Sequence, residues 1–547
     1  MGGLRTRYTG SMSTTAPEDG AASVIAASPP TPASDAANTT GSSVLGPSRT
    51  TWRARWNKWR GDDGTDALVG LVVLGVFIEI FLVVLVARFP LTKFYPGPGV
   101  SLGFPQMMSG FWDRDFRWLA IVLAAPFAAF VPALWLARDL RGRAAIAIVF
   151  GFAVLFGLTL IRLYPITAAD LFHYLADARS LWVYHQNPMQ VPPLKHPFII
   201  GISWAQQPSP YGPFWQLLSV IPVMFTGDHW AGSIYGLKLL SMAFYLAAAV
   251  LVFLTVRRTW PGRELLATMV FAWNPFVVFR TIGNGHNDVV MMAFALAAFY
   301  FVSRRNWLLA LPLLALSVCI KYSTALIVPP VLLYAWMTAG RDNRRELVQG
   351  AGIAAAVTLL VFVPFWRGFD TFKTFVQNAN MTITSVPQLV SLKLQPARAP
   401  DDADHLVRQI GFLLFFLTYA GMLAGLYFRP SFRTLIAVSS LAFIGYLVLD
   451  TWWFRPWYFI WFLSLSALLP SFWWTALAVA ASFGATFFDL IEQYRSHWDW
   501  VWSDSFRGYA APVVAAFLPL LLLLVLGLAI SGAWTMLRDP VRHESSA

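Results

Sequence analysis

A cluster of ionisable and polar side chains follows a long apolar run near residue 165. Its members are Asp170, His173, Tyr174, Asp177 and Arg179. At helical spacing the first four of these side chains share one face. A carboxylate in such a cluster can accept a proton from an attacking hydroxyl group, which is the task of a general base. The alternative is that these groups cap a helix and pair with one another.

A second polar group lies in a glycine-rich turn between two apolar runs. Gly283 and Gly285 break the helical pattern there, directly before His286, Asn287 and Asp288. These three side chains could bind hydroxyl groups of a sugar, or Asn287 or Asp288 could simply cap the next helix. One imidazole, one amide and one carboxylate form a weak metal signature, so we predict no metal ligands.

Two further sites combine a cation with aromatic side chains. Lys321 and Tyr322 interrupt an apolar stretch, and a lysine at membrane depth indicates function because burying it unpaired is costly. The ammonium could hold a phosphate group, or it could reach the interface and serve only as an anchor. Arg455 lies directly before Trp457 and Tyr458, so a guanidinium that binds phosphate stands beside rings that can stack on a sugar.

The composition indicates which elements must position these residues. Of 547 residues, 57% are hydrophobic and only 12% are charged, so most of the chain belongs in lipid. Apolar runs of about 20 residues, the length that crosses a hydrocarbon core, recur from residue 65 almost to the C-terminus. We therefore predict an all-α, polytopic membrane protein of about fourteen transmembrane helices. The predicted spans are 65–89, 116–138, 144–164, 231–256, 264–281, 287–303, 306–320, 323–338, 346–364, 407–428, 432–449, 455–469, 471–488 and 510–537.

Cysteine and charge exclude two classes of site. The single cysteine, Cys319, has no partner, so a disulfide framework and a cysteine metal site are both excluded. The net charge of +12 comes from arginines spread over short turns at helix ends. This distribution is typical of membrane topology and not of nucleic-acid binding.

The arginines also predict the topology, because cationic residues collect on the cytoplasmic side. All the clusters fall on one side if both termini are cytoplasmic and the run 213–227 lies at the interface without crossing. The clusters are Arg138/Arg141/Arg143, Arg257/Arg258/Arg263, Arg304/Arg305, Arg341/Arg344/Arg345, Arg429/Arg433 and Arg538/Arg542. Four polar segments then face outward, so a site built from them is external. They are 165–212, 282–288, 365–406 and 450–455.

Five regions follow from these patterns. Residues 1–50, rich in Ala, Ser, Thr and Pro, are predicted to form a disordered cytoplasmic tail. Residues 51–64 alternate tryptophans with basic residues and form a juxtamembrane segment. Two N-terminal transmembrane helices (65–143), a central transmembrane module (144–470) and C-terminal helices with a short cytoplasmic tail (471–547) complete the chain.

In order along the chain, these motifs resemble the GT-C superfamily of integral-membrane glycosyltransferases. The resemblance is to bacterial polyprenyl-phosphomannose-dependent mannosyltransferases and their family-87 relatives, and it covers about residues 144–470. It implies that this module is catalytic and that its large external loop carries juxtamembrane helices. It rests on Asp170, Tyr174 and Arg179, Tyr211-Gly212-Pro213, Asn274-Pro275, Gly285-His286-Asn287-Asp288, Lys321-Tyr322 and Arg455-Pro456-Trp457-Tyr458. Two features depart from the family pattern: its paired acidic motif is spread over Asp170 and Asp177, and two spans precede the first external loop.

The resemblance implies an inverting hexosyltransferase with Asp170 as the catalytic base, although the spread acidic motif leaves Asp177 as an alternative. The donor would be a polyprenyl-phosphate sugar, with mannose as the family default, and the acceptor a glycan or glycolipid. Residues implied to bind substrate are His173, Tyr174, Asp177, Arg179, Tyr211, His286, Asn287, Asp288, Trp457 and Tyr458. Residues implied to bind the donor phosphate are Lys321, Tyr322, Arg455 and Arg280.

The implied location is the extracytoplasmic face of a bacterial plasma membrane. We expect no cofactor and no nucleic-acid partner, and the sequence leaves a divalent-metal requirement undetermined. No P-loop is present, which suits a lipid-borne donor. The alternative class is a transporter or flippase of lipid-linked sugars, which shares short helices and buried charges but usually has internal repeats, and we find none.

Overall fold

The computed structural model describes residues 64–94, 113–193, 205–379, 381–494 and 505–538. The predicted tail 1–50 and nearly all of the juxtamembrane segment 51–64 therefore lie outside the described residues, as do residues 539–547.

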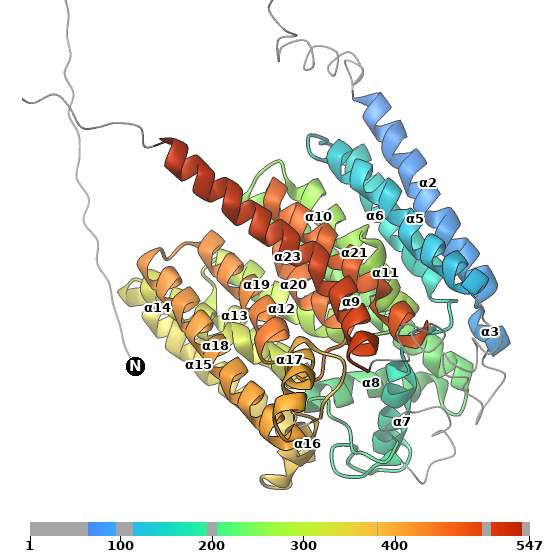
Figure 1. The fold of residues 1–547 in the computed structure, drawn as a ribbon, viewed down its shortest axis with the longest axis vertical. Helices are drawn as coiled ribbons and strands as arrows, with labels where there is room; N and C mark the ends of the chain where they lie inside the picture. The colour runs from blue at the N-terminus through green and yellow to red at the C-terminus, as the bar shows by residue number, and fades with distance from the viewer. Residues whose placement is uncertain (1–63, 95–112, 194–204, 380, 495–504, 539–547) are drawn as a thin grey trace, which may run out of the picture. The chain divides into compact units, whose positions relative to one another are not determined.

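Helices form all the regular structure of the described residues, apart from isolated bridges (Figure 1). The predicted all-α class is confirmed. The α-helices are α2 (Thr65–Arg88), α3 (Leu91–Phe94), α5 (Asp113–Ala137), α6 (Arg143–Leu160), α7 (Asp170–Trp182), α8 (Pro213–Thr226), α9 (Trp230–Thr259), α10 (Glu264–Ala272), α11 (Pro275–Val278), α12 (Asp288–Ser303), α13 (Trp307–Ile320), α14 (Val328–Thr338), α15 (Arg341–Phe362), α16 (Lys373–Ala379), α17 (Val386–Leu394), α18 (Pro400–Phe428), α19 (Phe432–Leu449), α20 (Phe459–Ser466), α21 (Phe472–Tyr494) and α23 (Ser505–Arg538). Short 3₁₀ or π segments are η2 (Phe279–Gly283), η3 (Tyr322–Ile327), η4 (Val363–Phe365), η5 (Asp370–Phe372), η6 (Gln395–Ala397) and η7 (Pro456–Tyr458).

Within the described residues, nine helices are long and apolar enough to cross a membrane, or ten if the bent unit of α10, α11 and η2 is one span. A polytopic membrane protein is confirmed, but the predicted count of about fourteen is not. Several predicted spans form shorter helices, such as α12 with 16 residues and α13 with 14 residues. At about 1.5 Å per residue such helices are shorter than a hydrocarbon core of about 30 Å.

The run 213–227, which the charge pattern predicts not to cross the membrane, forms α8. This helix has 14 residues and is too short to span a bilayer unaided. It packs against both α7 and α9. Helices α7 and α8 are thus two short helices between the long helices α6 and α9, which is compatible with the juxtamembrane helices that the family resemblance implies for this part of the chain.

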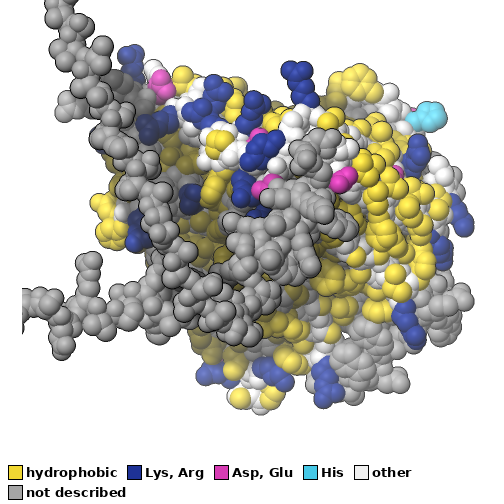
Figure 2. Space-filling view, turned by 90° about the horizontal axis from the view of Figure 1, so that it is seen from above, with side chains coloured by type: hydrophobic (Ala, Val, Ile, Leu, Met, Phe, Trp, Pro, Cys, Tyr) yellow, Lys and Arg dark blue, Asp and Glu magenta, His cyan; other side chains and the backbone are white. Residues whose placement is uncertain are grey.

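The cationic turns between long helices gather at one end of the described unit. The Arg141 side chain donates to the carbonyl of Gly262 at 2.8 Å, which joins the α5–α6 turn to the α9–α10 turn. Arg258 reaches the carbonyl of Ser303 at 3.1 Å, and Arg433 lies 3.8 Å over the Trp260 ring. Seen from above, Lys and Arg side chains lie beside hydrophobic ones with few acidic neighbours (Figure 2).

The candidate site residues lie at the other ends of the same helices. Helix α6 begins at Arg143 in a cationic turn and ends at Leu160, shortly before Asp170. Helix α19 begins beside Arg433 and ends at Leu449, directly before Asp450. The long helices therefore start in the cationic turns at one end and lead to the segments with the candidate site residues at the other end.

Lys238, on α9, is a fully buried cation that the sequence analysis did not single out. Its ammonium donates to the carbonyl of Leu160, the last residue of α6, at 3.4 Å, to that of Leu163 at 2.5 Å and to that of Ile282, in η2, at 3.2 Å. The last carbonyls of a helix lack intrahelical partners, and Lys238 satisfies them for both segments. It therefore ties together two helix ends that lead into the site.

We predict that Lys238→Met, which keeps the length of the side chain, lowers the free energy of unfolding by about 2 kcal/mol or more because buried carbonyls lose their donor. Thermal unfolding of the purified protein in detergent measures the effect. The control is Lys373→Met, since Lys373 is exposed and its replacement should change Tm little. An unchanged Tm for Lys238→Met would contradict the capping role.

Candidate active site

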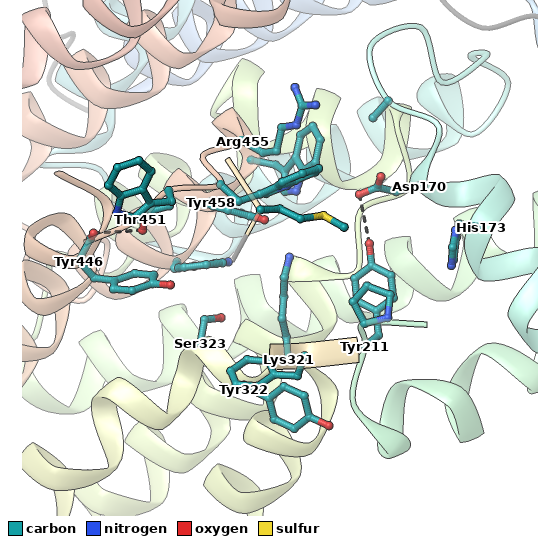
Figure 3. A pocket seen from close by; sticks show the side chains of 18 of the residues that line it. Asp170, His173, Tyr211, Lys321, Tyr322, Ser323, Tyr446, Thr451, Arg455 and Tyr458 are labelled. Carbon is teal, nitrogen blue, oxygen red and sulfur yellow. Dashed lines mark hydrogen bonds between the residues drawn. The ribbon is translucent and has the colours of Figure 1, made fainter. Parts of the chain in front are cut away.

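A cavity of about 860 Å³ lies where the polar segments converge. Its wall comes from distant parts of the chain: the start of α7, the segment before α8, η3, the first half of α18, the turn after α19 with η7, and the end of α21. Figure 3 shows Asp170 and Tyr211 on one side, Tyr446 and Thr451 on the other, and Lys321, Tyr458 and Arg455 between them. Three of the four polar segments predicted to face outward therefore border one chamber, whereas no residue of 282–288 lines it.

Asp170 is the first residue of α7, and its side chain is 22% exposed toward the cavity. One carboxylate oxygen lies 3.4 Å from the Tyr211 hydroxyl and 3.4 Å from Nδ1 of His286. Burial by itself raises the pKa of Asp170, but the hydrogen bond and charge of His286, with the charge of Lys321, outweigh it and hold the pKa below its ordinary value. Asp170 is therefore an ionised proton acceptor at neutral pH.

Tyr211 reaches Asp170 because the residue after it is a glycine. The backbone N–H of Gly212 donates to the carbonyl of Ile320 at 2.9 Å, and a Cβ on Gly212 would lie 2.2 Å from the carbonyl oxygen of Cys319. This close approach places Tyr211 beside the segment that carries Lys321. Burial and the neighbouring carboxylate raise the pKa of Tyr211, so the phenol stays protonated and donates to Asp170.

The glycine-rich turn places His286 directly behind Asp170. Gly285 has a φ of 76°, and a Cβ there would lie 2.8 Å from Leu171, so only glycine suits the position. The imidazole of His286 stacks on Trp457 with 3.9 Å between ring centroids. His286 is fully buried and does not line the cavity, whereas Trp457 does. His286 therefore contacts the carboxylate and an aromatic side chain of the wall, and no part of the open cavity.

Asn287 and Asp288 do not make the simple capping contacts that the sequence allows. Asn287 stands at the N-cap of α12 without a side-chain cap hydrogen bond, and its side chain accepts from the Tyr174 hydroxyl at 3.1 Å. Asp288 accepts from Nζ of Lys321 at 2.8 Å and from the indole of Trp461 at 2.5 Å. Both side chains are buried and organise the wall from behind.

Lys321 projects into the cavity with its side chain 16% exposed. Asp288 holds one side of the ammonium, and Nζ lies 4.7 Å from the centroid of the Tyr458 ring. A buried carboxylate partner and an aromatic face compensate much of the desolvation cost of the cation. A pure membrane anchor would not need such a partner, so the contacts favour a binding role over the anchoring alternative.

Arg455 borders the cavity beside aromatic rings and an acidic partner. Its Nη1 donates to Glu492 at 2.9 Å, and its guanidinium lies 5.7 Å from the Trp453 ring and 6.0 Å from the Trp457 ring. The side chain is 18% exposed. Arg455 and Lys321 thus present two cations to the same chamber as Asp170.

The structure brings some of the predicted residues to the cavity surface and leaves others behind it. Those on the surface are Asp170, His173, Tyr211, Lys321, Tyr322, Arg455, Trp457 and Tyr458. Those that do not line it are Tyr174, Asp177, Arg179, His286, Asn287, Asp288 and Arg280. Arg280 is fully buried and is hydrogen-bonded to Asp489 and Thr167, so its guanidinium is already engaged within the wall.

Asp177 and Arg179 face away from the chamber. Asp177 is fully buried and lies 3.5 Å from His173. Burial raises its pKa to about 6, with the charge of His173 opposing the rise. Arg179 donates to Asp228 at 2.6 Å and fixes α7 to the turn before α9. Of the two acids that the sequence leaves as candidate bases, only Asp170 borders the cavity.

Sequence reasoning missed several charged residues of the wall. Asp489 and Glu492 stand three positions apart just after the predicted span 471–488, a placement that mirrors Asp170 and could have drawn attention to them. Arg408 was missed as well, and it lines the cavity near Trp452. Asp450, in the polar segment 450–455 that the sequence places outside, also lines the cavity, and burial raises its pKa to about 6. Among the described residues, no three His, Cys, Asp or Glu side chains form a group that could hold a metal ion.

Parts of the chain are similar in sequence to known mannosyltransferases. Residues 103–339 match the family model described as "Alpha-(1->6)-mannopyranosyltransferase, N-terminal domain". The predicted resemblance to membrane mannosyltransferases is confirmed. Alpha-(1->6)-mannopyranosyltransferase A of Mycobacterium tuberculosis is 26% identical over 206 residues, which are 36% of this chain and 39% of that protein. Alpha-(1->6)-mannopyranosyltransferase B of Corynebacterium glutamicum is 28% identical over 142 residues, which are 24% of this chain and 23% of that protein.

The matched part of the chain thus spans less than half the length of either mannosyltransferase. Among solved structures, the archaeal oligosaccharyltransferase AglB from Archaeoglobus fulgidus, in complex with an inhibitory peptide and a dolichol-phosphate, has a TM-score of 0.38 and 14% sequence identity. That match covers 69% of this chain and 55% of AglB. A similarity at this level does not assign a substrate or a mechanism.

Proposed function

We propose that the protein transfers a hexose, mannose by resemblance, from a polyprenyl-phosphate carrier to a glycan or glycolipid acceptor with inversion of configuration. The observation that carries this proposal is that Asp170, Lys321 and Arg455 line one cavity, so a proton acceptor and two cations can act on the same substrate. The similarity to mannosyltransferases supports mannose as the transferred sugar. The cavity lies between apolar helices, which suits a lipid-borne donor.

The reaction needs one proton acceptor and one stabilised leaving group. The oxygen of the acceptor hydroxyl forms a bond to the anomeric carbon, and Asp170 accepts the proton that this hydroxyl loses. The bond from that carbon to the phosphate oxygen breaks, and its electron pair leaves with the polyprenyl phosphate. Lys321 and Arg455 stabilise the charge on the departing phosphate, and no further cofactor enters the scheme.

We further propose that the cavity opens on the extracytoplasmic face of a bacterial plasma membrane and that both termini are cytoplasmic. The cationic turns lie at the end of the helices opposite the cavity, and cationic turns stay on the cytoplasmic side of a membrane.

The test uses purified full-length protein in proteoliposomes with polyprenyl-phosphate-[¹⁴C]mannose and a mannose-containing glycolipid. We expect a labelled, lengthened glycolipid whose new linkage has the anomeric configuration opposite to that of the donor. Labelled donor that moves across the bilayer without a new glycosidic bond would overturn the proposal in favour of a flippase. Retained configuration would overturn the single-displacement mechanism.

A further inference from the structure

Each cation that the site was predicted to use has a carboxylate partner. Lys321 pairs with Asp288, Arg280 with Asp489, and Arg455 with Glu492. Two of these three carboxylates belong to α21, one helical turn apart and both on the cavity wall. Helix α21 lies outside residues 103–339, the part that matches the mannosyltransferase family model. The C-terminal region therefore contributes directly to the cavity.

Glu492 is held from two sides. Its Oε2 accepts from Arg455 at 2.9 Å, and its Oε1 accepts from the Thr384 hydroxyl at 2.9 Å. Thr384 is almost fully buried, and the neighbouring backbone N–H of Ile383 donates to the carbonyl of Trp452 at 2.9 Å. Because both oxygens are engaged and the side chain is only 11% exposed, the carboxylate has one defined position.

Arg455 is engaged at one edge only. Nη1 binds Glu492, and no other hydrogen bond of this guanidinium is found among the described residues. The guanidinium has five N–H donors, so the others stay available to a ligand in the cavity. A long side chain with a free cationic end would otherwise sample many rotamers. A fixed carboxylate at one edge restricts it to the orientation that the cavity presents.

We propose that Glu492 is a positioning residue that orients Arg455 for the phosphate group of the donor. The proposal rests on the proposed function, since that function supplies the phosphate. Glu492 reduces the net positive charge of the site, but it fixes the geometry of the group that makes the hydrogen bonds. Removal of Glu492 distinguishes these two contributions in a binding experiment. If Glu492 mainly positions Arg455, the donor should bind more weakly without it; if its negative charge mainly repels the phosphate, the donor should bind more tightly.

The test is a double-mutant cycle on full-length protein with Glu492→Ala, Arg455→Ala and both together. We expect each single variant to raise the donor KM about 10-fold while the acceptor KM changes little. The double variant should be no worse than Arg455→Ala within about 2-fold, because Glu492 acts only through the arginine. The proposal would be overturned if the increases in donor KM of the two single variants multiplied in the double variant. A donor KM that falls in Glu492→Ala would also overturn it.

Two further variants separate positioning from folding. Glu492→Gln retains an oxygen for Arg455 and a second polar atom for Thr384, so its donor KM should lie between wild type and Glu492→Ala. The matched control is Glu264→Gln, a carboxylate at the opposite end that accepts from the backbone of Gly262 and should leave the donor KM unchanged. A purely structural role of Glu492 would lower Tm and the active fraction without raising the donor KM, and that result would also overturn the proposal.

Failure of the proposed function is recognised separately. If wild-type protein forms no glycosidic bond with the mannosyl donor, the proposed function fails. Binding of sugar-free polyprenyl phosphate to the same variants still tests Glu492, since that lipid carries the phosphate that Arg455 would contact. Equal affinity of wild type and Glu492→Ala for this lipid would overturn the positioning role.

Discussion

Asp170→Asn is expected to lower kcat about 10²–10⁴-fold, because an amide cannot accept the proton of the attacking hydroxyl. Asparagine has nearly the same shape, so the contacts of this position with Tyr211 and His286 should largely persist and the protein should stay folded. The measurement is initial-rate mannosyl transfer at saturating donor and acceptor, together with the Tm of the variant. Retention of most of the turnover by a folded Asp170→Asn protein would remove the base assignment.

Asp177→Asn is the matched control for this prediction. Asp177 is buried beside His173 and does not line the cavity, and burial raises its pKa to about 6, so its neutral form costs less than that of an ordinary aspartate. An uncharged asparagine should therefore be tolerated there, and turnover should fall far less than in Asp170→Asn. A loss as large as that of Asp170→Asn would make Asp177 the better candidate for the base.

The pH profile distinguishes the same two carboxylates. Since the surroundings of Asp170 hold its pKa below the ordinary aspartate value, the base is ionised at neutral pH and loses its charge only in strong acid. The acidic limb of kcat/KM, which reports groups of the free enzyme, should lie in that low range. An acidic limb near pH 6 would instead match Asp177 or Asp450, whose pKa values burial raises to about 6.

Lys321→Met is the second change with a large expected effect, a fall of about 10–10³-fold in kcat/KM for the donor. In the proposed reaction, this change removes the ammonium from the chamber where the leaving phosphate develops charge. The same change leaves the buried Asp288 without its cation, so Tm should fall as well. Donor kinetics and thermal unfolding of the same preparation measure the two effects.

The double variant Lys321→Met with Asp288→Asn separates binding from stability. Removing the unpaired buried charge should restore much of the lost Tm, because the neutral amide costs less to bury. The donor kcat/KM should stay low, because no cation has been returned to the cavity. Recovery of both quantities would show that Lys321 serves only to neutralise Asp288.

The sequence by itself determined the fold class and the general position of the site. Long apolar runs in a chain of this length can be satisfied only by helices in lipid, since backbone groups there must bond within their own segment. The spacing of arginine turns along the chain separated the two ends, and Asp170, Lys321 and Arg455 stood out as charges next to apolar runs. These features depend on local composition, which a single sequence displays directly.

The number of spans and the partner of each charge were decided only by tertiary structure. Helices such as α12 and α13 are shorter than a bilayer core, and α8 and α10 end at glycine or a proline turn, so hydrophobic runs alone could not fix the count. Whether a polar side chain faces a cavity depends on the angle at which its helix packs. This is why His286 and Asp288 lie behind the wall, whereas Asp489 and Glu492 reach it from a region outside the part that matches the family model.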